Sequence, residues 1–275
     1  MTSELPDNYR ERLAAPGSAL YYALRFAPPV QRAPLLVVHA LCDEILGVPW
    51  TVSEAGVAQV KLEWWRSEID RMFRGEGRHP LAQPLAGLIT PYNLPRQPFE
   101  TLIDGALMDV QYGSYPDGGG LATYLHHTGI PLAELELHIC RPGDAPLATA
   151  AHHAGMGLRL TTLLRDLRPA LEQGRCYLPE SDLAAIGLSA DNLRHHADHA
   201  GLAGVLDSQV EQAESLLRQA EEALPTPAPD TRFLRIRLRL ARALLQEMRK
   251  AGLPMLEQGL ALTPLRRLWL AWRTR

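Results

Sequence analysis

Apolar residues recur at helical spacing along almost the whole chain, and the strict apolar–polar alternation that is typical of strands is missing. Proline and glycine interrupt this pattern at several points, but no interruption is long enough to be a domain linker. The chain has only four Phe, so Leu and Ala supply most of the core, and both residues favour helices. We therefore expect an all-α protein of one domain over residues 1–275.

Start and stop signals divide the chain into a series of predicted helices. Ser53 and Glu54 are typical of a helix start, and Gly75 and Gly77 of the corresponding stop. Pro28 with Pro29 separates the first two predicted helices. The predicted helices span 19–27, 31–47, 53–74, 81–92, 98–112, 121–139, 147–171, 191–200, 202–224, 232–251 and 264–272.

Several classes of protein are not expected from this sequence. The polar, acidic start has no basic region leading into an apolar run, so we expect no secretory signal. The longest apolar stretch, 33–41, is far shorter than the roughly 20 residues that span a bilayer. Cys42, Cys140 and Cys176 cannot form a disulfide framework and suit a reducing compartment. We expect a cytoplasmic protein, either free or peripheral on the inner face of the membrane.

Charge is divided unevenly between the body and the carboxyl-terminal end. Residues 232–275 carry eleven basic residues against two acids, a local balance of +9, which leaves −12 for residues 1–231. Arg232, Arg235 and Arg239 form a helical stripe, but the acidic body and the lack of interleaved aromatics argue against a nucleic-acid partner. A membrane surface or a membrane protein complex is the partner that this asymmetry favours; a solvated basic helix face is the alternative.

The last predicted helix is amphipathic. Leu265, Leu268, Trp269 and Trp272 fall at i, i+3, i+4 and i+7, whereas Arg266, Arg267 and Arg273 lie off that stripe. Trp beside Arg on a short helix suits a membrane interface, so Arg266, Arg267, Trp269 and Trp272 are the candidate membrane contacts. The alternative is that the stripe packs on the protein's own body.

Four blocks of the sequence, over residues 18 to about 190, resemble the squalene/phytoene synthase family in the family's order. They are Ser18–Phe26, the run from Trp65 to Asp70 with His79-Pro80-Leu81, Phe99–Asp109, and Leu160–Leu167 followed by Gly174–Pro179. The resemblance implies an isoprenoid-synthase fold around a central cavity. It also implies head-to-head condensation of two prenyl diphosphates with magnesium.

That chemistry depends in the family on two acidic motifs, D-D-x-x-D and D-x-x-x-D, because hard oxygen ligands must hold magnesium against a diphosphate. When the chain is aligned on Ala40-Leu41-Cys42, the first aspartate pair falls on Leu46 and Gly47. A rival register takes Asp43 and Glu44 as the pair. In either register the first motif is incomplete.

The second motif is half retained. Asp166 matches its first aspartate, but Ala170 stands four residues later, after Pro169. Arg159, Thr162 and Asp166 share one helical face. Arg159 either holds an anion directly or neutralises Asp166 in a structural ion pair, and we expect the pair.

The loss of motif aspartates leads to a hypothesis about function. Asp166, and Asp43 in the rival register, are the remnants of the catalytic set, so we predict no metal site and no cofactor. The chain would then be a scaffold, assembly or lipid-binding protein with a prenyl or lipid ligand, similar to the family's non-catalytic branch that assembles respiratory complex I. The alternative is an active, magnesium-dependent prenyl-diphosphate transferase.

The resemblance also supplies candidates for the wall of the cavity: Tyr22, Arg25, Asp104, Asp109, Arg159, Thr162, Asp166, Arg175 and Tyr177. Cys42 resembles a buried core position of the family. His195 and His199 are four residues apart, but without a third ligand a solvated helix is the stronger interpretation.

Overall fold

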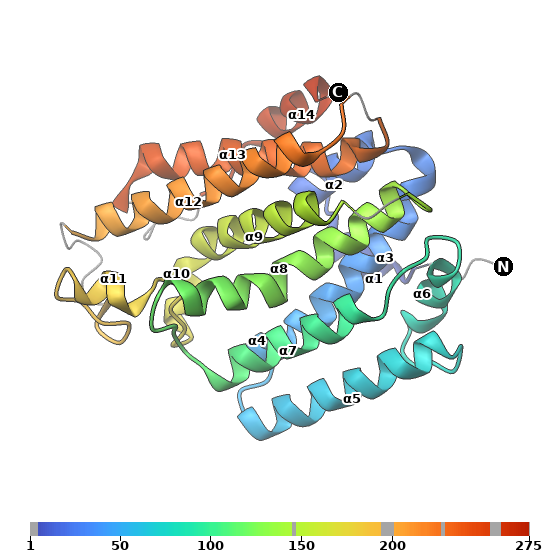
Figure 1. Ribbon diagram of the computed structural model, residues 1–275, viewed down its shortest axis with the longest axis horizontal. Coiled ribbons are helices and arrows are strands. Elements are labelled where there is room, and N and C mark those ends of the chain that lie inside the picture. The colour runs from blue at the N-terminus through green and yellow to red at the C-terminus, as the bar shows by residue number, and fades with distance from the viewer. Residues whose placement is uncertain (1–4, 145–146, 194–200, 227–228, 254–259, 275) are drawn as a thin grey trace.

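The computed structural model describes residues 5–144, 147–193, 201–226, 229–253 and 260–274, and it is all-helical over these residues, without a strand (Figure 1). The α-helices are α1 (Asp7–Leu13), α2 (Ala19–Phe26), α3 (Pro29–Leu46), α4 (Val48–Thr51), α5 (Ala55–Phe73), α6 (Ala82–Ile89), α7 (Gln97–Gln111), α8 (Gly118–Cys140), α9 (Ala148–Arg165), α10 (Leu167–Glu172), α11 (Glu180–Ala184), α12 (Leu202–Ala223), α13 (Arg232–Ala251) and α14 (Pro264–Arg273). The predicted fold class is confirmed.

Local chemistry explains several of these boundaries. The Ser18 side chain accepts a hydrogen bond from the backbone N–H of Tyr21 at 3.1 Å, which satisfies one of the free donors at the start of α2. Asp117 caps α8 in the same way through the N–H of Gly120, at 2.8 Å. Proline in the first turn suits the start of α3, α7 and α14, because the missing N–H has no helical partner there.

The helix predicted over 147–171 is divided in the structure. α9 ends at Arg165, and Asp166 lies between α9 and α10 with φ −99° and ψ 17°. The physical reason is Pro169, whose ring clashes with the carbonyl of residue 165 and which has no N–H to donate. This break places Asp166 at a helix end.

The remaining differences concern short helices and one start signal. α1, α4 and α11 have seven, four and five residues, too few to show a clear apolar period. α5 begins at Ala55, two residues later than the predicted start at Ser53, with Glu54 at the cap position and no side-chain cap bond. Most of the helix predicted over 191–200, including His195 and His199, lies outside the described residues.

The long helices lie roughly side by side and surround a central pair, α8 and α9 (Figure 1). Gly129 of α8 and Gly155 of α9 let this pair approach closely, since a Cβ at Gly129 would lie 2.3 Å from the Gly155 carbonyl oxygen. α12 and α13 pack on α9, α3 and α7 pack on α8, and α14 lies on α13 and α2. In this view α14 and α5 are at opposite edges of the molecule.

None of the helices over the described residues is both long enough and apolar enough to cross a bilayer.

Candidate functional site

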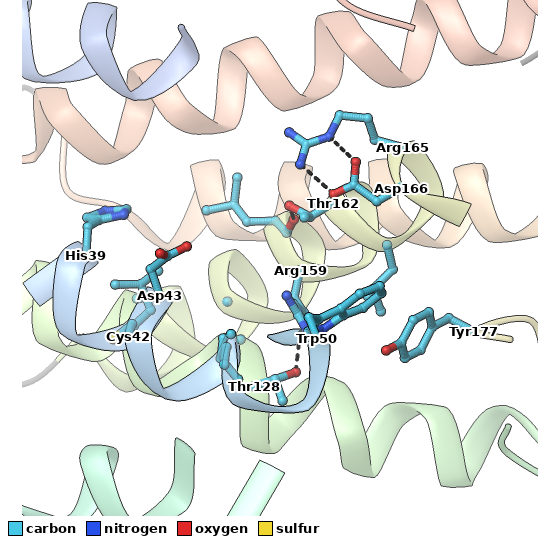
Figure 2. Close-up of a pocket in the computed structure, with 18 of the residues that line it drawn as sticks. His39, Cys42, Asp43, Trp50, Thr128, Arg159, Thr162, Arg165, Asp166 and Tyr177 are labelled. Carbon is cyan, nitrogen blue, oxygen red and sulfur yellow. Dashed lines mark hydrogen bonds and ion pairs between the residues drawn. The ribbon is translucent and has the colours of Figure 1, made fainter. Parts of the chain in front are cut away.

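A cavity of about 530 Å³ lies between α3, the α4 turn, α8 and α9. Asp43 near the end of α3 and Asp166 at the end of α9 line it from opposite sides (Figure 2). The guanidinium groups that line it belong to Arg159, Arg165 and Arg237. The cavity therefore presents two carboxylates and three guanidiniums, in place of the carboxylate-rich wall that the resemblance implies.

The carboxylate of Asp43 is held in an ion pair with a helix that the sequence did not predict. Arg12 of α1 contacts Asp43 at 2.8 Å and Glu44 at 3.0 Å. Burial raises the pKa of Asp43, and the nearby Arg12 opposes this change. Arg12 therefore provides the positive charge beside Asp43, the acid of α3 that lines the cavity.

The carboxylate of Asp166 is paired with its immediate neighbour. Arg165 donates from Nε to Oδ1 at 2.7 Å and from Nη2 to Oδ2 at 2.6 Å, a two-bond contact drawn in Figure 2. These bonds raise the pKa of Arg165. The prediction of an ion pair between Arg159 and Asp166 is wrong. Asp166 lies at the helix break and pairs with Arg165 instead.

Arg159 takes part in a different, buried network. Its guanidinium donates to the Tyr124 hydroxyl at 2.6 Å and to Thr128 Oγ1 at 3.2 Å. The Tyr124 and Tyr177 hydroxyls both donate to the carboxylate of Asp109, at 2.6 and 2.9 Å. Burial raises the pKa of Asp109, and Arg159 opposes this change. Within the part of the chain that the structure describes, Arg159 forms no direct ion pair, so its charge is only indirectly compensated.

A second buried cluster supports the α3 side of the cavity. Glu136 of α8 is fully buried and contacts His39 Nε2 at 2.7 Å and the guanidinium of Arg237 from α13. Burial lowers the pKa of His39, although its hydrogen bond to Glu136 acts in the opposite direction. His39 and Arg237 line the cavity, whereas Glu136 holds both of them from behind.

Four of the remaining candidates lie at the cavity or next to it. Thr162 and Tyr177 line the cavity with Asp166 and Arg159. Asp109 lies just behind this wall, and Arg175 lies beside it, donating to the Pro49 carbonyl at 2.7 Å.

Three other candidates lie away from the cavity. Asp104 is half-exposed on α7 in an ion pair with Arg66 at 2.8 Å. Arg25 is exposed on α2. Tyr22 packs against the apolar core from α2. The resemblance alone could not place these side chains, because a shared helix block does not determine which face of the helix turns inward.

Other side chains at the site were not candidates from the sequence. The sequence could have indicated Arg165, because this residue stands directly before Asp166 in the retained motif. No local pattern in the sequence indicates His39, Trp50 or Arg237, because these residues come together only through packing of α3, α4 and α13. Trp50 stacks on Tyr177 with ring centroids 6.4 Å apart, and Arg175 covers Trp50 at 4.9 Å.

The donor set at the cavity does not fit the family's magnesium cluster. Leu46 and Gly47 line the wall where the first aspartate pair would stand. A Cβ at Gly47 would lie 2.8 Å from the Asp43 carbonyl oxygen, so this helix end leaves little space for an aspartate. Over the described residues, no three His, Cys, Asp or Glu side chains are grouped so that they could hold a metal. Both lining acids are already paired with arginine.

A second pocket of about 380 Å³ adjoins the first and shares part of its lining, including Arg165 and Arg237. No Asp or Glu lines it among the described residues. Its further walls are apolar, from α2 and α13, with Arg267 of α14 at one side. Burial lowers the pKa of Arg267, and the positive charge of Arg165 acts in the same direction. Each of the two pockets thus combines arginine side chains with apolar walls.

Comparison with known proteins identifies the family. The family model described as squalene/phytoene synthase matches residues 13–269. The chain belongs to the squalene/phytoene synthase family. It is 29% identical over 220 residues to the presqualene diphosphate synthase of Rhodopseudomonas palustris, covering 80% of this chain and 78% of the relative. It is 25% identical to the 15-cis-phytoene synthase of Synechococcus elongatus, covering 84% and 79%.

Solved structures of similar fold support the architecture of this family member. The squalene synthase HpnC from Alicyclobacillus acidocaldarius matches with a TM-score of 0.76 and 24% identity, over 90% of this chain and 96% of that chain. A dehydrosqualene synthase in complex with ligand matches with a TM-score of 0.80 and 19% identity, over 98% and 96%. At these identities the likeness shows the isoprenoid-synthase fold alone.

Proposed function

We propose that this family member binds a prenyl diphosphate in the central cavity and acts as a prenyl-diphosphate transferase. The single observation that carries the proposal is the pair of adjoining pockets, in which Arg159, Arg165 and Arg237 stand beside apolar side chains. An amphiphile with a polyanionic head and a hydrocarbon tail matches that lining. Relatives named presqualene diphosphate synthase and phytoene synthase support transfer chemistry better than they support a purely structural role.

The arrangement suits the first chemical event of such a reaction. The bond between the allylic carbon and the diphosphate oxygen breaks, and the electron pair leaves with the diphosphate. Guanidinium donors stabilise the charge that develops on the leaving group, because each presents several N–H bonds in fixed directions. The carbocation that remains is captured by a double bond of a second prenyl diphosphate, which then loses a proton to the released diphosphate; Trp50 and Tyr177 line the same cavity. No step is assigned to magnesium, since the donor set does not fit its cluster.

A catalytically silent scaffold or lipid-binding protein, of the kind that assembles a membrane respiratory complex, is the second candidate. The observation that favours it is the state of the two lining acids. Asp43 and Asp166 are each paired with an arginine, and Leu46 and Gly47 replace the first aspartate pair. In such a protein the ligand would bind without being converted.

Turnover separates the two candidates. The purified full chain is incubated with farnesyl or geranylgeranyl diphosphate, in magnesium and in EDTA, and both diphosphate release and extracted hydrocarbons are measured. We expect release, and we expect an unreactive thiodiphosphate analogue to bind in EDTA as well. Arg165→Gln should reduce both signals. Arg168→Gln is the matched control, because this exposed arginine three residues further on pairs with Glu172 at 3.0 Å.

Each result has a definite meaning. Binding without release in either buffer would contradict transfer and support the scaffold or lipid-binding role. Absence of both binding and release would contradict the proposal as a whole.

A further inference from the structure

α14 carries a large apolar face that the rest of the protein does not cover. Leu265 is 79% exposed, Trp272 65%, Trp269 48% and Leu268 39%, although Leu and Trp are usually buried. Leu270, on the opposite side of the helix, is buried against the body. The apolar stripe that the sequence shows therefore faces outward, and it is the other side of the helix that packs.

The outward face belongs to a helix that is held firmly in place. Arg266 forms an ion pair with Glu247 of α13 at 2.8 Å, and Arg267 donates to the Gly17 carbonyl at 2.8 Å. Arg232 of α13 donates to the carbonyl of Thr274 at 2.9 Å, just beyond the end of α14. Contacts at both ends of the helix thus keep the stripe turned away from the core.

Arginines without carboxylate partners gather beside the end of α14. Arg25, Arg32 and Arg232 line a surface hollow that has no Asp or Glu among its described residues, and Arg273 lies 4.8 Å from the Trp269 ring. None of these four forms an ion pair within the described part of the chain. Elsewhere on α13, Arg237 pairs with Glu136, Arg242 with Glu221 and Arg249 with Glu214, whereas Arg235 and Arg239 form no ion pair within the described residues. Four arginines without a carboxylate partner among the described residues thus lie on α2, α3, α13 and α14.

We propose that this face, consisting of the Leu265, Leu268, Trp269 and Trp272 stripe and its arginine rim, docks on a bilayer that contains anionic lipids. The Trp rings enter the headgroup region, and the arginines meet the lipid phosphates. A second copy of the chain fits less well, because a two-fold contact would place the same four uncompensated arginines against each other.

The position of the face also connects it with the proposed function. Arg267 lies on the inner side of α14 and lines the pocket that adjoins the central cavity. One helix therefore separates the docking face from the pocket. The docking proposal itself stands on exposure and charge, and it does not require that the chain has transferase activity.

Vesicle flotation of the full chain tests the proposal. One set of vesicles contains phosphatidylcholine alone, and the other contains about 30% phosphatidylglycerol as anionic lipid. We expect binding to the anionic vesicles, and about tenfold weaker binding in high salt. The double variant Trp269→Ser/Trp272→Ser should bind at least about tenfold more weakly, because its apolar anchors are lost. Arg25→Gln/Arg32→Gln should lose about tenfold or more on anionic vesicles.

The matched control is a second exposed apolar pair far from α14. Val57 and Val60 of α5 are 51% and 71% exposed, so Val57→Ser/Val60→Ser tests general surface stickiness. Circular dichroism melts of all variants show that they fold. The proposal is overturned if anionic vesicles do not float the chain, or if the α5 variant loses binding as much as the Trp variant. It is also overturned if sedimentation shows a dimer that the Trp substitutions remove while vesicles leave the chain unbound.

Discussion

Each of two walls of the cavity carries an aspartate that is paired with an arginine, but the two arginines come from different parts of the chain. On the α9 wall, Asp166 is paired with Arg165, the residue directly before it in the chain. On the α3 wall, Asp43 is paired with Arg12, which comes from a separate helix 31 residues earlier. Behind the α3 wall lies a further buried cluster, in which Glu136 holds His39 and Arg237.

This difference shows which ion pairs form between neighbours in the chain and which form only in the complete fold. The pair on the α9 wall needs only the helix break at Asp166, so it can form as soon as α9 forms. The charges on the α3 wall need α1, α8 and α13 in their final places. We therefore expect substitutions on the α3 wall to affect folding, and those on the α9 wall to affect ligand binding.

The largest effect on stability is expected at the buried acid behind the α3 wall. Glu136→Gln removes the negative charge that compensates Arg237 and weakens the contact to His39. We expect the free energy of unfolding to fall by about 3 kcal/mol, measured by urea denaturation. Glu134→Gln, two residues away on α8 and without that partner set, is the control. A loss of less than about 1 kcal/mol would show that this wall does not depend on the cluster.

The next effect is expected on ligand binding at the α9 wall. Arg165→Gln removes a guanidinium that lines both pockets, so binding of a thiodiphosphate analogue should weaken about tenfold to a hundredfold by calorimetry. Asp166→Asn removes a negative charge from the same place, so binding should stay the same or become tighter. If Asp166→Asn weakened binding as much as Arg165→Gln, a metal-ligand role for the carboxylate would be favoured.

The α3 wall should also make stability depend on pH. His39 has a lowered pKa in the folded protein because it is buried, so the unfolded chain binds more protons as the pH falls below about 6.5. Its contribution is present above that pH and is lost as the pH falls toward the folded value. We expect melts between about pH 7 and 5 to show a decline that His39→Gln reduces. An equal decline in the variant would assign it to other groups, such as His79, whose pKa burial also lowers.

The smallest effect is expected at the partly exposed pair of the α3 wall. Arg12 is about half exposed, so Arg12→Gln should change the free energy of unfolding by less than about 1 kcal/mol. The same variant should raise the pKa of Asp43 further, because Arg12 opposes the effect of burial. Carboxyl chemical shifts measured by NMR would show this change. Arg10→Gln on the same helix is the control and should leave Asp43 unchanged.

The long helices were predictable because their apolar period extends over many turns. The short helices were not, since α4 has only four residues and α1 seven. The cavity wall was predictable only where a side chain stands in or beside a block that resembles the family, as Asp166, Thr162 and Tyr177 do. His39 and Arg237 reach the cavity from helices that are nearly 200 residues apart in sequence, and no local pattern carries that contact.

The amino-acid sequence is sufficient to predict the helical architecture, the loss of the family's aspartates and the amphipathic character of α14. These properties depend on the spacing of residues that are near each other in the chain. The tertiary structure is needed to show which arginine neutralises each carboxylate. It is also needed to show that the Trp-bearing side of α14 faces outward. Those outcomes depend on how helices far apart in the sequence pack, because packing determines which face of each helix is covered.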